Sequence, residues 1–277
     1  MFAIRKQLEE TIPFLKSKTL IEPKLGIIMG TGMGKVGELI EKDVVIPYEE
    51  IPHFATSTVE SHDGNLIFGH LRGVPVMAMH GRFHFYEGYD MHTITYPVRT
   101  MKALGIGTMI VSNSAGGLNP LFRPGDIVLM TDHINLMGDN PLRGVNDPEL
   151  GVRFPDMSRA YTPELRELAE KVALETGTRM VQGVYVGLMG PNLETAAEYR
   201  FLRSIGADTV GMSTVPEVTV AVHSGMRVLG FSLVTDMCLP DALEPATLES
   251  ILSTADKADA KLSDLVAEIV PRIKFEK

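Results

Sequence analysis

The side chains with the clearest chemical potential lie together at 80–89, which reads His-Gly-Arg-Phe-His-Phe-Tyr-Glu-Gly-Tyr. Arg82, His84 and Glu87 follow an apolar run at 74–79 that predicts a buried strand. A guanidinium offers an oxyanion a planar fork of donors, and an imidazole offers one more. In open α/β sheets, ligands collect beyond the carboxyl ends of strands. The spacing therefore predicts an anion site, and a solvated loop with a few charges is the alternative for this segment taken alone.

Other apolar runs end in the same manner, in loops of glycine, hydroxyl or acidic residues. Two of these loops carry the carboxylates Glu194 and Asp236. Each loop alone is equally typical of a tight turn or a helix start. Together they would bring phosphate donors, an aromatic and methionine wall and two carboxylates to one edge of a sheet. The loops lie at 30–34, 112–119, 190–195, 211–214 and 235–236.

Strand-like and helix-like stretches alternate along the chain, which is the pattern of a single α/β domain over residues 1–277. A Thr-Pro-Glu sequence at 162–164 predicts the start of one helix, and the spacing at 214–217 predicts a capping box at another. An apolar stripe from about 247 to 272, which includes Leu248, predicts a C-terminal helix packed on the core. Strands are expected at 25–29, 66–68, 74–79, 109–111, 127–130, 184–188, 209–210 and 228–234.

Composition and charge limit the class of protein. The chain has 277 residues, of which 44% are hydrophobic and 22% charged, as in an ordinary globular protein. A formal net charge of -9 without a Lys/Arg run argues against nucleic acid or an anionic membrane as a partner, but permits a small anion. The single cysteine, Cys238, excludes an intramolecular disulfide and a cysteine-cluster metal site.

The sequence gives no sign of a membrane or export segment. No apolar run approaches the roughly 20 residues that span a bilayer. The N-terminal stretch, Met-Phe-Ala-Ile-Arg-Lys-Gln-Leu-Glu-Glu, carries acid early and lacks the uninterrupted apolar region of a signal peptide. We therefore expect a cytoplasmic protein whose partners are small molecules.

Other chemistries leave weaker signals. The glycines at 32, 34 and 37 match the dinucleotide fingerprint, which would make the chain an NAD-binding oxidoreductase, but the helix that they would open is poor. The sequence has neither a Gly-x-Ser-x-Gly elbow nor a His-Glu-x-x-His motif, so hydrolase classes are disfavoured. His80 and His84 lie four residues apart, yet Gly81 and the preceding strand oppose a helical metal pair. Cys238 has no histidine beside it in sequence and is expected to be a packed or pocket-edge thiol.

These motifs occur in an order that resembles the trimeric family of purine nucleoside phosphorylases, within the nucleoside phosphorylase superfamily. The resemblance runs nearly end to end, and the combination is specific although each motif alone is weak. The matching motifs are Gly30-Thr31-Gly32, Gly81-Arg82-Phe83-His84-x-Tyr86-Glu87-Gly88, Asn113-x-Ala115-Gly116-Gly117, Gly190-Pro191-x-x-Glu194-Thr195 and Gly211-Met212-Ser213-Thr214-Val215-Pro216-Glu217.

The resemblance implies an α/β domain with a central mixed, partly barrel-like β-sheet flanked by helices. It also implies the reversible phosphorolysis of purine (deoxy)ribonucleosides to free purine and (deoxy)ribose 1-phosphate, a reaction of purine salvage. Phosphate attacks C1′ of the sugar while the base departs, so positioning and electrostatic stabilisation would carry the catalysis. Inorganic phosphate would be a co-substrate, no cofactor or metal would be needed, and the enzyme would be a homotrimer.

The resemblance further implies roles for individual residues. Phosphate would be held by Thr31, His62, Arg82, His84, Ser114 and Ser213. Ribose would be contacted by Tyr86, Tyr185, Met212 and, from a neighbouring subunit, Phe154. The base would lie against Ala115, Leu193, Glu194 and Asp236. The catalytic residues would be His84, Glu194 and Asp236.

Asp236 and Leu248 depart from the pattern of the family and leave the substrate open. Glu194 favours 6-oxopurines, because an ionised carboxylate accepts from N1–H. Family members restricted to 6-oxopurines usually have Asn in place of Asp236, and a carboxyl group donates to N7 or O6 only when it is protonated. The related methylthioadenosine phosphorylases have Asp there, and Leu248 replaces a usual His beside the ribose 5′-hydroxyl. Phosphorolysis of 5′-methylthioadenosine is therefore the main alternative.

Overall fold

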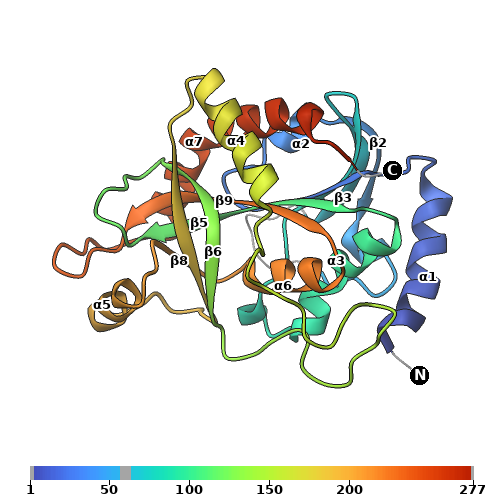
Figure 1. Ribbon diagram of the computed structural model, residues 1–277, viewed down its shortest axis with the longest axis horizontal. Helices are drawn as coiled ribbons and strands as arrows, with labels where there is room; N and C mark the ends of the chain where they lie inside the picture. Colours follow the sequence, from blue (N-terminus) through green and yellow to red (C-terminus); the bar gives the residue numbers. More distant parts are fainter. Residues whose placement is uncertain (1–2, 57–63, 276–277) are drawn as a thin grey trace.

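The computed structural model describes residues 3–56 and 64–275, and their strands join in one sheet (Figure 1). The strand order is β2-β3-β4-β1-β5-β8-β7-β6-β9, and β9 also pairs with β5. The strands from β5 to β9 thus close into a barrel, and β1 to β4 extend from it as an open wing. The strands are β1 (Leu25–Met29), β2 (Glu41–Pro47), β3 (Asn65–Leu71), β4 (Val74–His80), β5 (Thr108–Gly117), β6 (Ile127–Leu136), β7 (Met180–Leu188), β8 (Thr209–Gly211) and β9 (Arg227–Met237).

Strand directions are mixed, and the directions decide where a ligand can collect. β1 runs parallel to both β4 and β5, and β5 runs parallel to β9. The carboxyl ends of these strands therefore meet at one edge of the sheet. β3 is antiparallel to its neighbours, as are the pairs β5–β8 and β6–β9. The predicted mixed, partly barrel-like sheet is confirmed.

Helices flank the sheet on both faces, as expected (Figure 1). α4 and α7 pack together over one apolar cluster, and α3 and α6 pack together over another. α1 lies against α3 at the rim of the wing. The helices are α1 (Ala3–Lys18), α2 (Val36–Leu39), α3 (Met91–Ala103), α4 (Pro163–Glu175), α5 (Ala196–Ser204), α6 (Val215–His223) and α7 (Leu248–Ile269), with 3₁₀ turns at Tyr48–Glu50, Phe85–Glu87 and Val270–Arg272.

Several elements differ in extent from the sequence prediction. β2 was not predicted, because its outer residues are polar and only one of its side chains is fully buried at the edge of the sheet. β5, β6 and β9 run beyond their apolar stretches, since pairing inside the barrel supplies hydrogen-bond partners whatever the side chain. The Ser-Asn-Ser-Ala-Gly-Gly segment at 112–117 is accordingly the end of β5 and not a loop.

The start of α4 shows how strand pairing can override a helix cap. The helix begins at Pro163 as predicted, but the Thr162 hydroxyl accepts no bond from its first turn. That hydroxyl instead accepts from the Val228 N–H at 3.0 Å, and the Thr162 N–H donates to the Val228 carbonyl at 2.9 Å. Thr162 therefore ties α4 to β9 and does not cap the helix.

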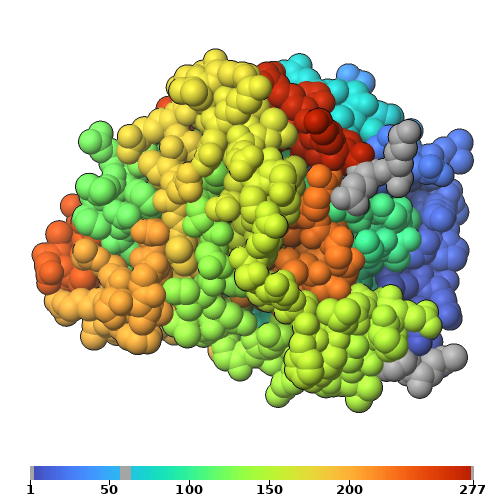
Figure 2. Space-filling model, in the orientation of Figure 1, coloured from blue at the N-terminus to red at the C-terminus, as the bar shows by residue number. Residues whose placement is uncertain are grey.

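The long connection at 137–162 runs past α1 before the chain enters α4 (Figure 1). Figure 2 shows this yellow-green segment as a lobe beside the blue N-terminal helix. The guanidinium of Arg5 fastens it, with its Nε 2.5 Å from Asp147 Oδ2. Phe154 lies on this connection and is 86% exposed. None of the helices within residues 3–56 and 64–275 combines the length and the apolar character that a membrane crossing needs.

Candidate active site

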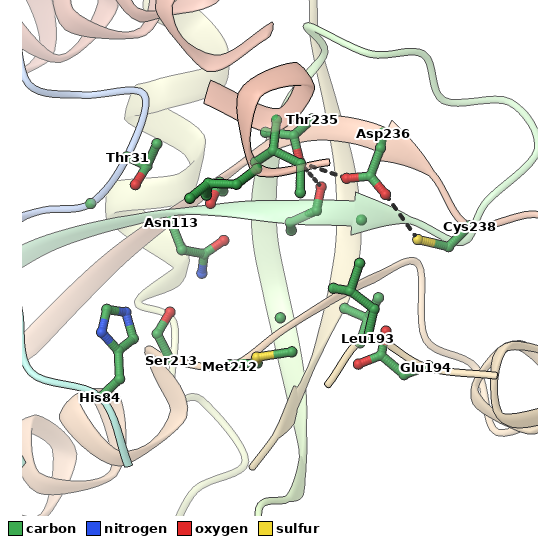
Figure 3. A pocket seen from close by; sticks show the side chains of 18 of the residues that line it. Thr31, His84, Asn113, Leu193, Glu194, Met212, Ser213, Thr235, Asp236 and Cys238 are labelled. Atoms are coloured by element: carbon green, nitrogen blue, oxygen red, sulfur yellow. Dashed lines mark hydrogen bonds between the residues drawn. The ribbon is translucent and has the colours of Figure 1, made fainter. Parts of the chain in front are cut away.

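A cavity of about 230 Å³ opens where the strands of the barrel end (Figure 3). Its walls come from the loops after β1, β4, β7 and β8, from the ends of β5 and β9, and from the first turns of α7. The predicted site residues that line it are Thr31, Arg82, His84, Tyr86, Ser114, Ala115, Leu193, Glu194, Met212, Ser213 and Asp236.

The cavity has two chemically different ends. Figure 3 places Thr31, His84 and Ser213 at one end. We call this end, together with Arg82, the cationic end. The opposite end is formed by Leu193, Glu194, Asp236 and Cys238, and we call it the carboxylate end.

Arg82 is the most constrained residue of the cationic end. Its side chain is only 2% exposed, and Nη1 donates to Thr214 Oγ1 at 2.8 Å. Nη2 donates to the carbonyl of Ser112 on β5, and Glu217 Oε1 lies 3.5 Å from Nη1. A buried cation needs such an anionic and polar environment to remain charged. The sheet and α6 therefore fix the guanidinium in one orientation at the floor of the cavity.

His84 is oriented by a carboxylate three residues along the chain. Glu87 Oε1 accepts from the His84 N–H at 2.7 Å and lies 3.1 Å from His84 Nδ1. The ring also stacks on Tyr86, with centroids 4.7 Å apart and planes 14° from parallel. Burial and the charge of Glu87 raise the pKa of Tyr86 to about 12, so its phenol stays protonated and can donate. Glu87 and Tyr86 thus fix the orientation of the His84 ring, and the Tyr86 phenol keeps a hydrogen to donate.

A carboxylate of the protein already occupies the backbone N–H groups of the glycine loop after β1. The N–H groups of Gly34 and Lys35 donate to the buried carboxylate of Asp259, at 2.8 and 3.1 Å. Ser263 completes the cluster by donating to the same carboxylate at 2.6 Å. Because an internal anion already occupies these donors, the loop offers no cradle to a pyrophosphate. The dinucleotide interpretation of the glycines at 32–37 is therefore wrong, and the loop instead presents Thr31 to the cavity.

Thr214 departs from its predicted role as a helix cap. Its hydroxyl makes no bond to the first turn of α6, and the backbone adopts φ +67° and ψ -47°. The side chain faces the sheet instead, where Oγ1 accepts from Arg82 and from Asn113 Nδ2, both at 2.8 Å. The capping-box prediction at 214–217 is wrong because buried donors claim the hydroxyl.

Tyr185 lies behind the cavity and does not line it. The side chain is completely buried on β7, and its hydroxyl accepts from the N–H of Ser213 at 3.1 Å. A Cβ on Gly211 would come within 2.6 Å of that hydroxyl, so glycine is what lets the two segments approach. The expected contact between Tyr185 and ribose is corrected accordingly, since the ring supports the loop that carries Ser213.

A β-bulge aims Asp236 at the cavity. The register between β5 and β9 shifts after Ala115, so that Gly116 pairs with Asp236 and Thr235 is the extra residue. Asp236 accepts from Thr235 Oγ1 at 2.8 Å and from Cys238 Sγ at 3.4 Å. Burial and the charge of Asp236 raise the pKa of the Cys238 thiol, which therefore remains a donor, as its expected role of a packed or pocket-edge thiol requires.

Glu194 faces the same end of the cavity from the start of α5. The helix is capped by Thr195 and Glu198, whose side chains and backbone N–H groups bond reciprocally. Glu194 is therefore not needed as the acid of that helix start, and its carboxyl group lines the cavity. Burial raises its pKa, a hydrogen bond from Tyr199 opposes the rise, and the charges of Glu198 and Asp236 add to it.

The mouth of the cavity is apolar. Leu248 opens α7 and is 64% exposed, and both Leu248 and Ile251 line the cavity. The sequence interpretation of the α7 stripe as core packing alone is thus wrong for its first turn. Thr235, Tyr199 and Ile251 also escaped the sequence analysis. Tyr199 lies on α5 five residues after Glu194, a spacing that does not place two side chains on one helix face, so no local pattern marks it.

Two more predicted residues remain to be considered. His62 falls outside the described residues. Phe154 does not line the cavity of its own chain and projects from the connection between β6 and α4. Within residues 3–56 and 64–275, no three His, Cys, Asp or Glu side chains gather as a metal ion would require.

Comparisons with known proteins agree along the length of the chain. A family model described as the phosphorylase superfamily matches residues 24–271. Purine nucleoside phosphorylase 1 of Geobacillus stearothermophilus is 50% identical over 266 residues, which cover 96% of this chain and 97% of that protein. The crystal structure of Schistosoma mansoni purine nucleoside phosphorylase in complex with adenosine has a TM-score of 0.93 at 40% identity and covers 98% of both chains. The Schistosoma enzyme in complex with hypoxanthine has a TM-score of 0.92 at 40% identity, covering 97% of this chain and 98% of that one.

Proposed function

Because the chain belongs to the purine nucleoside phosphorylases of the phosphorylase superfamily, we propose that it cleaves purine (deoxy)ribonucleosides with inorganic phosphate. The observation that carries this proposal is that one cavity has both a cationic end and a carboxylate end. The first end suits an oxyanion, and the second suits the hydrogen-bonding edge of a purine. The ribose would lie between them, beside Tyr86 and Met212.

In the proposed reaction, an oxygen of hydrogenphosphate bonds to C1′ as the bond from C1′ to N9 of the purine breaks. The base leaves with the electron pair of that bond and gains the proton that the phosphate loses. The products are therefore a free purine and ribose 1-phosphate, and the step needs no cofactor. The protein would contribute orientation and stabilisation of the charge that develops on the base.

At the cationic end, Arg82 and His84 would hold the phosphate through charge and directed hydrogen bonds. Thr31 and Ser213 would add hydroxyl donors, and Ser114 would bind through its backbone N–H. Since Arg82 is buried and tied to three partners, its position is set before phosphate arrives. His62 is proposed to join this end.

At the carboxylate end, Glu194 would accept from N1–H of a 6-oxopurine, and Ala115 and Leu193 would pack on the ring. Asp236 already accepts from a hydroxyl and a thiol of the protein. It could accept a third donor, such as the 6-amino group of adenine, more readily than it could donate to O6. Glu194 and Asp236 thus favour different purines. This supports a broadened choice of base.

A second candidate is the phosphorolysis of 5′-methylthioadenosine. Asp236 suits its 6-amino group, and the exposed Leu248 at the mouth suits an apolar 5′-thioether better than a hydroxyl. Glu194 opposes this candidate, because an ionised carboxylate repels the N1 lone pair of adenine.

We further propose that the protein acts as a homotrimer in the cytoplasm. The support is Phe154, a large apolar side chain that is 86% exposed on its own chain. In a trimer it would close the ribose region of a neighbouring cavity. Sedimentation of the purified protein measures the assembly, and Phe154→Ala should raise the KM for nucleoside while leaving the affinity for phosphate intact.

The function is tested by measuring kcat/KM for inosine, guanosine, adenosine and methylthioadenosine, each with and without phosphate. Phosphate-dependent cleavage of inosine and guanosine would support the first proposal with Glu194 dominant. A preference for adenosine or methylthioadenosine would show that Asp236 and Leu248 set the substrate. Absence of cleavage in every case would contradict both candidates.

A further inference from the structure

We infer that Thr214, which does not line the cavity, is a positioning residue that fixes Arg82 and turns the hydroxyl hydrogen of Ser213 toward the bound phosphate. The inference rests on the proposed function, since it concerns the phosphate of that reaction. It assigns a task to a residue that the sequence pattern placed in a helix cap. Three independent features of the structure carry it.

The first feature is the backbone of Thr214. Its φ of +67° and ψ of -47° are those of a classic γ-turn, and the Val215 N–H donates to the Ser213 carbonyl at 2.7 Å. A β-branched residue with positive φ is a genuine outlier, and such strain persists only where the surroundings impose it. Glycine would adopt this turn freely, yet the position holds a residue with a hydroxyl. We therefore infer that the strained backbone is tolerated because the site needs the hydroxyl of Thr214.

The second feature is the set of partners around that hydroxyl. Arg82 Nη1 and Asn113 Nδ2 each donate to Thr214 Oγ1 at 2.8 Å. A guanidinium and an amide nitrogen can only donate, so the two bonds use both acceptor positions of the oxygen. The remaining neighbour is Ser213 Oγ, at 3.1 Å. Thr214 must therefore donate its own hydrogen to Ser213.

The third feature is the position of Ser213 itself. Its N–H is bonded to Tyr185 at 3.1 Å, which holds the residue from behind, and its side chain lines the cationic end. Because its oxygen accepts from Thr214, its hydrogen is left to point into the cavity. A phosphate dianion needs donors, and a hydroxyl that presented only lone pairs would repel it. The polarity of the network thus makes Ser213 a donor to phosphate.

The network also explains how one residue can act on two phosphate ligands. Arg82 is buried, and besides Thr214 its guanidinium bonds the Ser112 carbonyl and lies 3.5 Å from Glu217. Loss of the Thr214 hydroxyl would leave Nη1 without the acceptor that it bonds at 2.8 Å. The guanidinium would then be held less firmly in the orientation that faces the phosphate.

The test compares Thr214→Val and Thr214→Gly, which lack the hydroxyl, with Thr214→Ser, which keeps it. Affinity for inorganic phosphate is measured by calorimetry, and the KM values for phosphate and inosine are measured separately. We expect the first two variants to bind phosphate roughly 10- to 100-fold more weakly, with the KM for inosine little changed. Thr214→Ser should restore binding. Glycine adopts the backbone angles of this turn without strain, so Thr214→Gly keeps the test decisive if Thr214→Val fails to fold.

Thr219→Val is the matched control, because Thr219 is a buried threonine on the same helix whose hydroxyl bonds only the Val215 carbonyl, at 2.7 Å. Its phosphate affinity should stay unchanged. A double-mutant cycle with Ser213→Ala isolates the hydroxyl direction, since the loss caused by Thr214→Val should shrink in the Ser213→Ala background. The effect that remains there measures the part transmitted through Arg82.

Two failures can be told apart. If the unsubstituted protein binds no phosphate and cleaves no nucleoside, the proposed function falls. If the unsubstituted protein binds phosphate and the variants without the hydroxyl bind it equally well, the inference about Thr214 is overturned. Fully additive losses in the cycle would overturn the part of the inference that concerns Ser213.

Discussion

The two ends of the cavity are built in different ways. At the cationic end, Arg82 is almost completely buried and is held by groups from β5 and α6. At the carboxylate end, Glu194 at the start of α5 and Asp236 near the end of β9 are only half-buried, and Leu248 at the neighbouring mouth is exposed. The cationic end is part of the packed interior, whereas the carboxylate end and the mouth are partly open to solvent.

This difference determines at which end of the cavity side chains can be substituted without disturbing the fold. Buried polar groups are costly unless every partner is present, so a substitution at the cationic end disturbs several bonds together. Side chains at the carboxylate end are less buried and make fewer bonds to the rest of the protein. The structure therefore predicts a fixed phosphate site combined with an adjustable base site and mouth, which is where Asp236 and Leu248 depart from the family pattern.

The largest effect is expected for Arg82→Ala, which tests whether the cationic end acts as one unit. Loss of a buried, preorganised cation should lower kcat/KM by roughly 10³-fold and weaken phosphate binding in parallel. It should also destabilise the fold, because Glu217 is left buried beside no cation. Steady-state kinetics with phosphate varied, together with a thermal melt, measure both. Arg72→Ala, which removes an exposed guanidinium 3.8 Å from Glu268, is the control, and a phosphate affinity unchanged in Arg82→Ala would refute the assignment.

Glu194→Ala tests the carboxylate end and should leave the cationic end untouched. We expect kcat/KM for inosine to fall by a factor on the order of 10²–10³, since hydrogen bonds to the departing base are lost, while phosphate affinity stays the same. Glu198→Ala, which removes the neighbouring acid that caps α5, is the matched control at a pH where Glu194 is ionised in both proteins, and there it should cost stability alone. An unchanged rate in Glu194→Ala would mean that this carboxylate does not contact the base.

Asp236→Asn sharpens the comparison within the carboxylate end. An amide can donate to O6 or N7, which a carboxylate that accepts from Thr235 and Cys238 cannot do. The ratio of kcat/KM for inosine to that for adenosine should rise by roughly 10- to 100-fold. Asp241→Asn changes an exposed carboxylate nearby and should leave the ratio alone. If Asp236→Asn also left it alone, Asp236 would not contact the 6-substituent.

The pH dependence should distinguish the two classes of purine. Burial and the charges of Glu198 and Asp236 raise the pKa of Glu194, so its carboxyl takes up a proton at higher pH than an ordinary glutamate. As the pH falls through that raised pKa, Glu194 stops accepting from N1–H, and kcat/KM for inosine should drop by about tenfold per pH unit. A protonated Glu194 can donate to N1 of adenine, so kcat/KM for adenosine should not fall over the same pH range. Glu194→Gln should abolish the difference, and parallel profiles for both substrates in the unsubstituted protein would contradict the assignment.

The same contrast governs what the sequence could predict. The cationic motif at 80–89 was found because its residues are contiguous and follow an apolar strand, and the carboxylates Glu194 and Asp236 were found because each follows another apolar run. The barrel-like sheet came from the resemblance, and the structure confirms it. What periodicity alone predicted correctly was the alternation of strands and helices.

The contacts that correct the sequence interpretation join residues far apart in the chain. Asp259 closes the glycine loop from 225 positions away, and Thr214 bonds Arg82 across 132 positions. A local pattern can suggest a phosphate cradle or a helix cap, but it cannot show that a distant carboxylate or guanidinium claims the same atoms. Tyr185, whose contact with ribose was implied by the resemblance, is buried on β7 and accepts a hydrogen bond from the Ser213 N–H.

The smallest effect is expected at the mouth, for Leu248→His. An imidazole there could bond a ribose 5′-hydroxyl, a gain of about 0.5–1.5 kcal/mol or roughly 2- to 10-fold in kcat/KM for inosine. The same change removes an apolar surface, so kcat/KM for methylthioadenosine should fall relative to kcat/KM for adenosine. The ratio of the rates for these two substrates is the measurement, and Leu174→His, on the remote exposed face of α4, is the control. Because the Leu248 side chain is exposed and apolar, the fold should not change. A ratio that stays constant would show that the first turn of α7 does not contact the 5′ substituent.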